Sequence, residues 1–275
     1  MSFLESKRFL QISNLVTYFL TIIVNFLANL IPLGGRNTGQ VSDNYPDLFA
    51  PAGITFSIWS VIYVLLGIFV FYQARDLFKE QEDDIPYVGT ISFYYILSNI
   101  FNISWLFSWH YNLIPLSLLI MIGILLTLIK IYLNLNIGLE DISTKDKILV
   151  HLPFSVYLGW ISIATIANTT AFLVATSWDG FGISEQVWTI IVLIIALILT
   201  LLMQFFRKDI AYSLVVIWAS IGIIIKRLAP ISLQILLLNF GVIFEPIYYE
   251  IAITAGIAII IISIGIILIV IQKLK

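Results

Sequence analysis

Long apolar segments constrain this chain more than any other feature of its sequence. Eight stretches of 16 to 27 residues are almost free of charge, and they cover residues 12–33, 54–73, 88–109, 114–133, 148–174, 187–206, 210–225 and 251–271. A helix of about 20 apolar residues crosses the hydrocarbon of a bilayer, because in lipid every backbone N–H and C=O must be paired within the segment. The sequence therefore predicts an all-α integral membrane protein with eight spans.

Composition excludes several other classes of protein. The chain has 275 residues, of which 60% are hydrophobic and 11% are charged, whereas about 45 to 50% apolar residues are usual in soluble domains. A water-soluble enzyme is therefore excluded. The net charge of −2, without a long basic tract, provides no surface for nucleic acid. The absence of Cys excludes disulfides and thiolate metal sites.

The positions of Lys and Arg predict the orientation in the membrane, since cytoplasmic flanks carry an excess of them. With eight spans and a cytoplasmic N-terminus, eleven of the 14 basic residues lie inside, and only Arg36, Lys226 and Arg227 lie outside. A ninth apolar stretch, 229–244, is short and is expected to be re-entrant or interfacial. Counting it as a span would leave only nine of the 14 basic residues inside, so the arrangement with eight spans is preferred. We therefore expect a multi-pass protein of the cell membrane with both termini cytoplasmic.

The chain divides into two parts of different character. Five of its seven Trp residues fall between positions 54 and 178, where Asn, Ser, Thr and Tyr also interrupt the apolar runs. The last three spans are mostly Ile, Leu and Val, and a turn-forming segment at 177–185 precedes them. We therefore predict a five-helix ligand-binding bundle over residues 1–178 and an apolar helical extension over residues 179–275.

Polar and aromatic residues of the first part recur at helical spacing, so that they share helix faces. The stripes are Thr21, Asn25 and Asn29 on the first span, Thr55, Trp59, Tyr63 and Gly67 on the second, Tyr95, Asn99, Asn102, Trp105 and Trp109 on the third, and Tyr157, Trp160, Ala164 and Asn168 on the fifth. An amide that faced lipid would lose its hydrogen bonds, so these stripes should face the bundle interior. Ordinary helix packing also explains such stripes, and Trp109 and Trp178 are expected in an interfacial belt.

Three motifs resemble those of a known family. They are Pro51 to Gly67 (PAGITFSIWSVIYVLLG) on the second span, Asn102 to Phe107 (NISWLF) on the third, and Pro153 to Asn168 on the fifth, which includes YLGWISIATIAN. In this order and at these places they resemble the translocator protein family, also called tryptophan-rich sensory proteins or relatives of the peripheral benzodiazepine receptor. The resemblance covers about 165 residues and leaves the last three spans outside it.

The resemblance implies a five-helix bundle with a pocket that the loop between the first two helices covers. That family binds tetrapyrroles such as porphyrins and haem precursors, and we expect a membrane receptor or carrier for a hydrophobic planar ligand of this kind. No cofactor is required, and a porphyrin or haem-type molecule is the ligand that the resemblance implies. Carried over by position, the ligand-binding residues are Phe49, Pro51, Phe56, Trp59, Tyr63, Asn102, Trp105, Tyr157, Trp160 and Asn168.

The chain departs from the family in two ways that bear on its ligand. The family's Trp just before the second helix is absent, with Phe49 nearby instead. No Lys or Arg lies between Lys147 and Arg207, so the basic end of the fifth helix that is tied to sterol recognition in some relatives is missing. Sterol binding is therefore not expected.

Catalytic and metal-binding residues are scarce. His110 and His151 fall at opposite ends of their predicted spans, about 30 Å apart in depth, so they do not share a metal. We expect no enzymatic activity, and porphyrin breakdown rests on the resemblance alone.

The expected partners are membrane lipid, a hydrophobic small molecule and, as one option, a second copy of the chain in a homodimer. The alternatives are a small-solute permease, with its path between the two parts of the chain, and a structural assembly partner.

Overall fold

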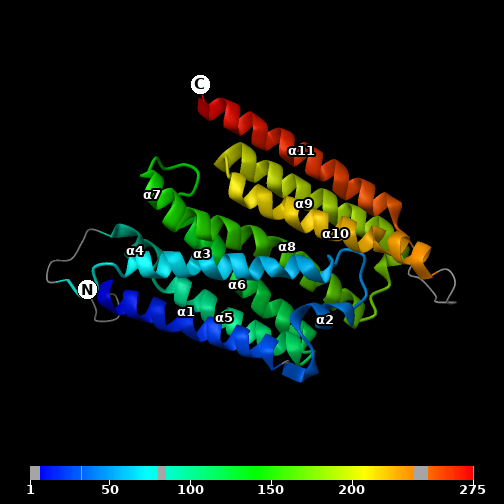
Figure 1. Cartoon of the computed structure of the whole chain (residues 1–275), viewed down its shortest axis with the longest axis horizontal. Coiled ribbons are helices and arrows are strands. Elements are labelled where there is room, and N and C mark those ends of the chain that lie inside the picture. Colours follow the sequence, from blue (N-terminus) through cyan, green and yellow to red (C-terminus); the bar gives the residue numbers. More distant parts are fainter. Residues whose placement is uncertain (1–6, 32, 80–84, 238–246, 275) are drawn as a thin grey trace.

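The computed structural model describes residues 7–31, 33–79, 85–237 and 247–274, and these residues form helices and connections without any β-strand. Long helices run side by side along the molecule (Figure 1). They are α1 (Lys7–Leu30), α3 (Ile58–Gln73), α5 (Phe93–His110), α6 (Ile114–Asn134), α8 (Leu152–Ala175), α9 (Glu185–Arg207), α10 (Ile210–Leu237) and α11 (Tyr249–Leu274). The predicted all-α membrane fold is confirmed.

Short helical elements join these long helices. Between α1 and α3 lie η2 (Leu33–Gly35), α2 (Thr38–Asp43) and η3 (Gly53–Ser57), and α4 (Pro86–Ile91) precedes α5. The connection from α6 to α8 holds α7 (Thr144–Asp146) and η4 (Lys147–His151), and η5 (Gly180–Gly182) lies before α9. We call the end of the bundle that holds α2 the α2 end and the opposite end the α4 end (Figure 1).

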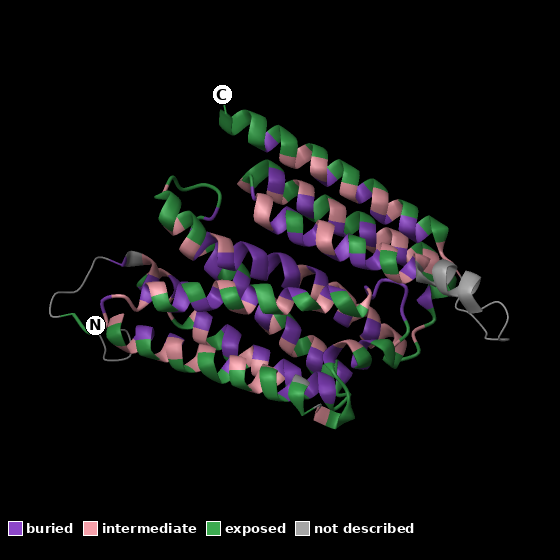
Figure 2. Ribbon diagram, in the orientation of Figure 1, coloured by how far each residue is buried: buried purple, intermediate pink, exposed green. Residues whose placement is uncertain are grey.

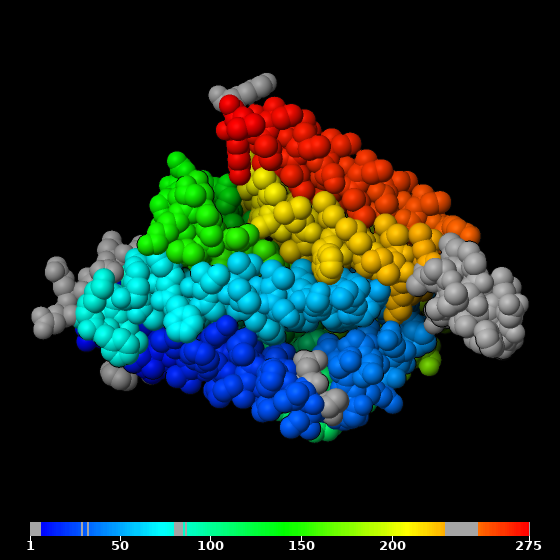
Figure 3. Space-filling view, in the orientation of Figure 1, coloured from blue at the N-terminus to red at the C-terminus, as the bar shows by residue number. Residues whose placement is uncertain are grey.

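Helix contacts arrange the long helices as a ring of five and a layer of three. Contacts run from α1 to α3, from α3 to α8, from α8 to α6, from α6 to α5 and from α5 back to α1. Helices α9, α10 and α11 pack on one another, and α10 joins them to the ring through α8. In the space-filling view, α10 and α11 lie on one side of α3 and α1 lies on the other (Figure 3). The division of the chain at residue 178 stays a prediction, although it matches this packing.

Helix α8 is the most enclosed of the long helices, because other helices of the ring pack on one side of it and α10 packs on the other. Its first half is buried almost continuously (Figure 2). Gly159 permits the close approach of α10: a Cβ built there would lie 3.1 Å from Val215 Cβ and 3.2 Å from the Tyr212 carbonyl oxygen. The extension is therefore packed tightly against the ring at this point.

The structure bears on three features of the predicted spans: the start of the third span, the stretch 229–244 and the number of spans. The third span begins later than residue 88, because Ser92, at φ 48° and ψ −138°, separates α4 from α5. Residues 229–237 continue α10 as helix and do not begin a helix of their own, and their re-entrant or interfacial placement stays a prediction; residues 238–244 lie outside the described residues. Within the described residues, seven helices are long and apolar enough to span a membrane, and α5 is not one of them. The count of eight spans stays a prediction.

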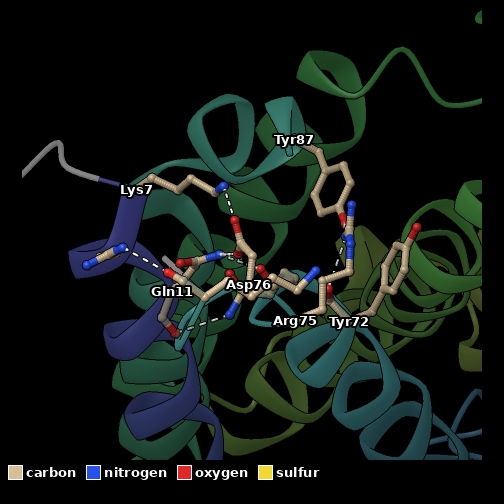
Figure 4. A network of polar contacts seen from close by, with 9 residues as sticks. Lys7, Gln11, Tyr72, Arg75, Asp76 and Tyr87 are labelled. Atoms are coloured by element: carbon tan, nitrogen blue, oxygen red, sulfur yellow. Dashed lines mark hydrogen bonds and ion pairs between the residues drawn. The ribbon is translucent and has the colours of Figure 1, made fainter. Parts of the chain in front are cut away.

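A buried polar network closes the α4 end of α1 and α3 (Figure 4). Asp76 is 1% exposed, forms an ion pair with Lys7 and accepts a hydrogen bond from Gln11 Nε2 at 2.7 Å. Gln11 Nε2 also donates to the Gln73 carbonyl at 2.7 Å, and Gln73 Nε2 donates back to the Gln11 carbonyl at 3.1 Å. Because an unpartnered buried carboxylate is costly, this network fixes the start of α1 against the end of α3.

We predict that Asp76→Asn lowers the free energy of unfolding by about 2 kcal/mol, because the Lys7 ammonium and the Gln11 amide lose a charged acceptor. Thermal unfolding of the purified protein in lipid nanodiscs measures the change. Asp141→Asn is the matched control, since Asp141 is almost fully exposed in its ion pair with Lys147. Equal melting temperatures for the wild-type protein and Asp76→Asn would show that the network is not stabilising.

Candidate ligand-binding site

A cavity of about 670 Å³ lies between α1, α2, α3 and α5 at the α2 end. We call it the α1–α3 cavity. Phe26, 62% exposed, stands on its α1 edge, and the exposed Ser60 lies on the α3 side. The cavity therefore opens sideways between two helices of the ring. Its lining residues are Ile22, Asn25, Phe26, Asn37, Thr38, Gly39, Gln40, Asp43, Gly53, Phe56, Ser57, Trp59, Ser60, Tyr63 and Trp105.

Helix α2 forms a wall of the α1–α3 cavity. Its start is fixed by a capping box, in which Asn37 Oδ1 accepts from the Gln40 N–H and Gln40 Oε1 accepts from the Asn37 N–H, both at 2.9 Å. Trp109 Nε1 donates to the Thr38 carbonyl at 3.1 Å. Trp109 is 4% exposed, so the prediction that it belongs to an interfacial belt is wrong. Instead, it anchors the wall of the cavity.

Trp59 is the centre of an aromatic cluster at the inner side of the cavity. Its ring stacks on Tyr63, with centroids 5.6 Å apart and planes at 21°, and lies 6.1 Å from the ring of Trp105. The rings of Tyr157 and Trp160 meet it edge to face, at 6.1 and 6.2 Å. Offset and edge-to-face rings are the favourable arrangements for aromatic pairs. Three helices therefore contribute to one aromatic surface.

Asn102 joins four helices by hydrogen bonds behind this aromatic surface. It is 1% exposed, and its Nδ2 donates to the Tyr157 hydroxyl at 3.1 Å. Its Oδ1 accepts from Asn25 Nδ2 at 3.0 Å and from the Tyr63 hydroxyl at 3.4 Å. Because each partner comes from a different helix, the side chain of Asn102 fixes the positions of α1, α3 and α8 relative to α5.

A smaller cavity of about 30 Å³ lies between the aromatic cluster and α8. We call it the tryptophan cavity. Phe56, Trp59 and Trp105 line both this cavity and the α1–α3 cavity, so these side chains separate the two. The amide of Asn168 is satisfied: its Oδ1 accepts from Trp105 Nε1 at 2.9 Å and its Nδ2 donates to Ser117 Oγ at 3.0 Å. Trp160 Nε1 is buried and has no hydrogen-bond partner among the described residues.

The structure brings most of the predicted site residues together. Phe56, Trp59, Tyr63 and Trp105 line the α1–α3 cavity, and Pro51, Trp160 and Asn168 join in lining the tryptophan cavity. Asn102 and Tyr157 lie behind them as hydrogen-bonded partners. Phe49 is 1% exposed within the hydrophobic core and lines neither cavity.

Sequence reasoning missed the contributions of α1 and α2 to the site. The stripe that contains Asn25 was recognised, but Ile22 and Phe26 beside it look like lipid-facing residues in the sequence. The spacing of Asn37 and Gln40 fits a capping box and marks a helix start, which is the available signal for α2. Nothing in the sequence indicates that this short helix lies along the cavity.

The described residues hold no group of three or more His, Asp or Glu side chains arranged to bind a metal ion. His110 Nδ1 lies 2.8 Å from the Leu106 carbonyl oxygen, one turn earlier in α5. The aromatic cluster and the amides around the α1–α3 cavity support binding by ring stacking, apolar contact and hydrogen bonds.

Helix α10 braces the segment that leads into α3. The Ala52 N–H donates to the Gly222 carbonyl at 3.0 Å, and Trp218 Nε1 donates to the Thr55 carbonyl at 3.0 Å. Gly222 lets the two segments meet, since a Cβ built there would lie 2.0 Å from Thr55 Oγ1. The extension therefore helps to position η3, which carries Phe56 at the cavity.

Asp47 holds the turn between α2 and η3. Its Oδ1 accepts from the N–H groups of Phe49 at 2.9 Å and Ala50 at 2.7 Å, which is how Asp side chains commonly stabilise turns. Burial raises the pKa of the Asp47 carboxyl to about 6, although these hydrogen bonds and the charge of Lys226 oppose the rise. The carboxyl is therefore ionised at neutral pH at a cost in stability.

Apolar helices long enough to span a membrane, arranged in a ring with a lined cavity, make the chain a multi-span membrane protein with a candidate ligand-binding site. A family model described as TSPO-like protein matches residues 11–270. The chain belongs to this family of membrane-bound ligand-binding proteins. The match includes α9, α10 and most of α11, so the expectation that the last three spans lie outside the family is wrong. Neither the comparison with curated proteins nor that with solved structures found a match.

We predict that Gly222→Ala lowers the free energy of unfolding by about 1 to 3 kcal/mol, because its methyl group overlaps Thr55 and forces α10 away from η3. Thermal unfolding in nanodiscs measures the change. Gly256→Ala on α11 is the matched control, since a Cβ there meets nothing within 4 Å, and Ala favours helix. Equal effects of the two substitutions would show that the close approach of α10 to η3 does not contribute to the free energy of unfolding.

We predict that Asp47→Asn becomes more stable relative to the wild-type protein as the pH rises from 4 to 7. The folded pKa of about 6 exceeds the ordinary value of 3.8, so the native state binds the proton more tightly and loses stability as the carboxyl ionises. The relative gain is about 2 to 3 kcal/mol, and Asn retains the acceptor for both N–H groups. Unfolding curves at several pH values measure it, and a gain that does not vary with pH would contradict the assignment.

Proposed function

We propose that this protein is a membrane receptor or carrier that binds a hydrophobic planar ligand, of the tetrapyrrole class, in the α1–α3 cavity. The observation that carries the proposal is the aromatic cluster around Trp59. The rings of Trp59, Tyr63 and Trp105, from α3 and α5, border a cavity of about 670 Å³, and the α8 rings of Tyr157 and Trp160 pack edge-on against Trp59. That volume lies in the usual range of small-molecule sites, about 300 to 1,000 Å³. A flat macrocycle gains most from such a surface, because its faces stack on aromatic rings.

The polar groups around the cavity suit a ligand with a polar edge. Asn25, Asn37 and Gln40 place side-chain amides on the α1 and α2 walls, and Ser57 and Ser60 add hydroxyl groups on the opposite wall. These groups supply donors and acceptors without the cost of a buried charge. The sideways opening between α1 and α3 gives a hydrophobic molecule a route from the lipid.

The unpartnered N–H of Trp160 provides a donor deeper in the site. A buried donor without an acceptor costs about 1 to 3 kcal/mol, and an acceptor atom on a ligand would recover it. Because Phe56, Trp59 and Trp105 line both cavities, a rotation of Trp59 would join the tryptophan cavity to the α1–α3 cavity. We therefore assign Trp59 to stacking on the ligand and Trp160 to its orientation.

The orientation proposed from the sequence also agrees with the arrangement of helices. The first residue of α1 and the last residue of α11 lie toward the same end of the molecule (Figure 1). The Lys226 ammonium lies 2.9 Å from Asp43 at the α2 end, which puts two segments assigned to the outer side together. We propose the cell membrane as the location, with both termini cytoplasmic. The homodimer remains a proposal as well.

The alternative of a small-solute permease gains no support from the packing between the two parts of the chain. Its path was expected between the ring and the extension, yet α8 and α10 meet closely at Gly159, with Val215 and Tyr212 against it. A solute path there would require these helices to separate. We therefore favour ligand binding within the ring.

We predict that Trp59→Ala weakens protoporphyrin binding by about tenfold and Trp160→Ala by about five- to tenfold, from lost stacking and a lost donor. Porphyrin fluorescence, titrated with the full-length protein in nanodiscs, measures the affinity. The exposed aromatic Phe205 on α9 supplies the control: Phe205→Ala should bind as the wild-type protein does. Trp160→Phe separates the contributions, because it retains the ring and removes the N–H. If Trp59→Ala and Trp160→Ala bind as tightly as the wild-type protein, the site is wrongly assigned.

A further inference from the structure

A second large cavity, of about 530 Å³, lies between the end of α8 and the start of α9. We call it the α8–α9 cavity. It shares no lining residue with the α1–α3 cavity, although the connection from α2 to η3 borders it through Asp47 and Leu48. It is therefore a separate site, built largely by the extension and its junction with the ring.

Two tryptophans give the α8–α9 cavity an aromatic wall. The ring centroids of Trp178 and Trp188 lie 5.2 Å apart, with their planes at 53°. Trp188 Nε1 donates to the Gly180 carbonyl at 2.9 Å, so its polar edge is already satisfied. What these indoles offer to a ligand is therefore their π surface, which attracts a cation.

Three carboxylates line the same cavity, and no Lys, Arg or His among the described residues joins them there. Each carboxylate is fixed in place by backbone donors. Asp47 Oδ1 accepts from two N–H groups, Glu185 Oε1 accepts from the Leu48 N–H at 2.8 Å, and Asp179 Oδ1 accepts from the Phe181 N–H at 3.0 Å. The Lys226 ammonium, which interacts with Asp47, is held 2.9 Å from Asp43 outside this lining. The cavity therefore carries negative charge beside an aromatic and apolar surface.

We propose that the α8–α9 cavity binds a lipophilic organic cation, in which an ammonium group is attached to an apolar body. The carboxylates and the indole faces recognise the positive charge, while Leu173 and its apolar neighbours accommodate the body. A zwitterionic phospholipid headgroup carries the same ammonium, but its phosphate would lie close to three carboxylates. A free amine fits this charge pattern better than a lipid does.

Three probes of equal chain length test the proposal. Hexyltrimethylammonium supplies the cation, its isostere with carbon in place of nitrogen supplies the same shape without charge, and hexylphosphocholine adds the phosphate of a lipid headgroup. Isothermal titration calorimetry of the full-length protein in nanodiscs measures the affinity for each probe. The buffer is at about pH 7.5, so that Asp47 is ionised, because burial raises the pKa of this carboxyl to about 6. We expect the cation to bind at least about tenfold more tightly than either of the other probes.

Two variants locate the binding. Glu185→Gln removes a charge but retains the acceptor for the Leu48 N–H, so the connection stays in place, and we expect about fivefold weaker binding of the cation. Trp188→Ala removes an indole face and should weaken binding by about five- to tenfold. Glu140→Gln, at an exposed position between α6 and α7, and Phe205→Ala are the matched controls.

The outcomes are distinct. Equal affinity for the cation and the neutral isostere would overturn the proposal, as would unchanged cation affinity in Glu185→Gln. Equal affinity for hexylphosphocholine would overturn the choice of a free amine and assign the cavity to lipid. Protoporphyrin binding is tested with variants of other residues. A negative result of the cation test therefore does not affect the function proposed for the α1–α3 cavity.

Discussion

The fold depends on the need of each polar side chain inside an apolar bundle to find its partner within the bundle. Asn102 shows this most clearly, since its one amide is bonded to side chains of α1, α3 and α8. An amide in hydrocarbon without partners costs several kcal/mol, so sliding or rotating one helix breaks bonds that lipid does not replace. Apolar contacts alone specify helix positions weakly in a membrane, because lipid tails are as apolar as Leu. The polar side chains therefore determine how the helices of the ring are placed.

The same requirement explains why the aromatic cluster has a fixed shape. Trp105 is tied to Asn168 and through it to Ser117, which connects α5, α8 and α6. Tyr63 and Tyr157 both bond to Asn102, so the rings on either side of Trp59 are held by their hydroxyl groups. Trp59 and Trp160 have only ring contacts among the interactions described above, and Trp59 rotates at lower cost because it is half-buried whereas Trp160 is buried. A surface of fixed rings with one adjustable ring suits the binding of a flat ligand.

The sequence predicted the parts of the site that follow from periodicity and motif. Trp59, Trp105 and Trp160 each lie on a stripe, and a stripe of polar and aromatic residues in a membrane helix has to face inward. Phe49 and Trp109 were harder to place, because both lie near helix ends, where the direction of a side chain depends on the connection and not on the helix period. The wall formed by α2 was missed for the same reason. Its position depends on a tertiary contact, from Trp109 to the Thr38 carbonyl, and helical spacing carries no information about it.

The extension was the least predictable part, since nearly uniform Ile and Leu give no stripe that points to a partner. Its role follows instead from a few contacts with the connection between α2 and α3. Lys226 forms an ion pair with Asp43. The Gly222 carbonyl accepts a hydrogen bond from the Ala52 N–H, and the Glu185 carboxylate accepts one from the Leu48 N–H. These anchors come from α9 and α10, and they hold the connection that forms part of the linings of both the α1–α3 cavity and the α8–α9 cavity. A connection of this length without such anchors would lose its fixed shape, because its backbone groups would find water as readily as each other. Helices α9 and α10 therefore do more than thicken the bundle: they fix the segment between two cavities of different chemistry, one rich in aromatic rings and amides and the other in indoles and carboxylates.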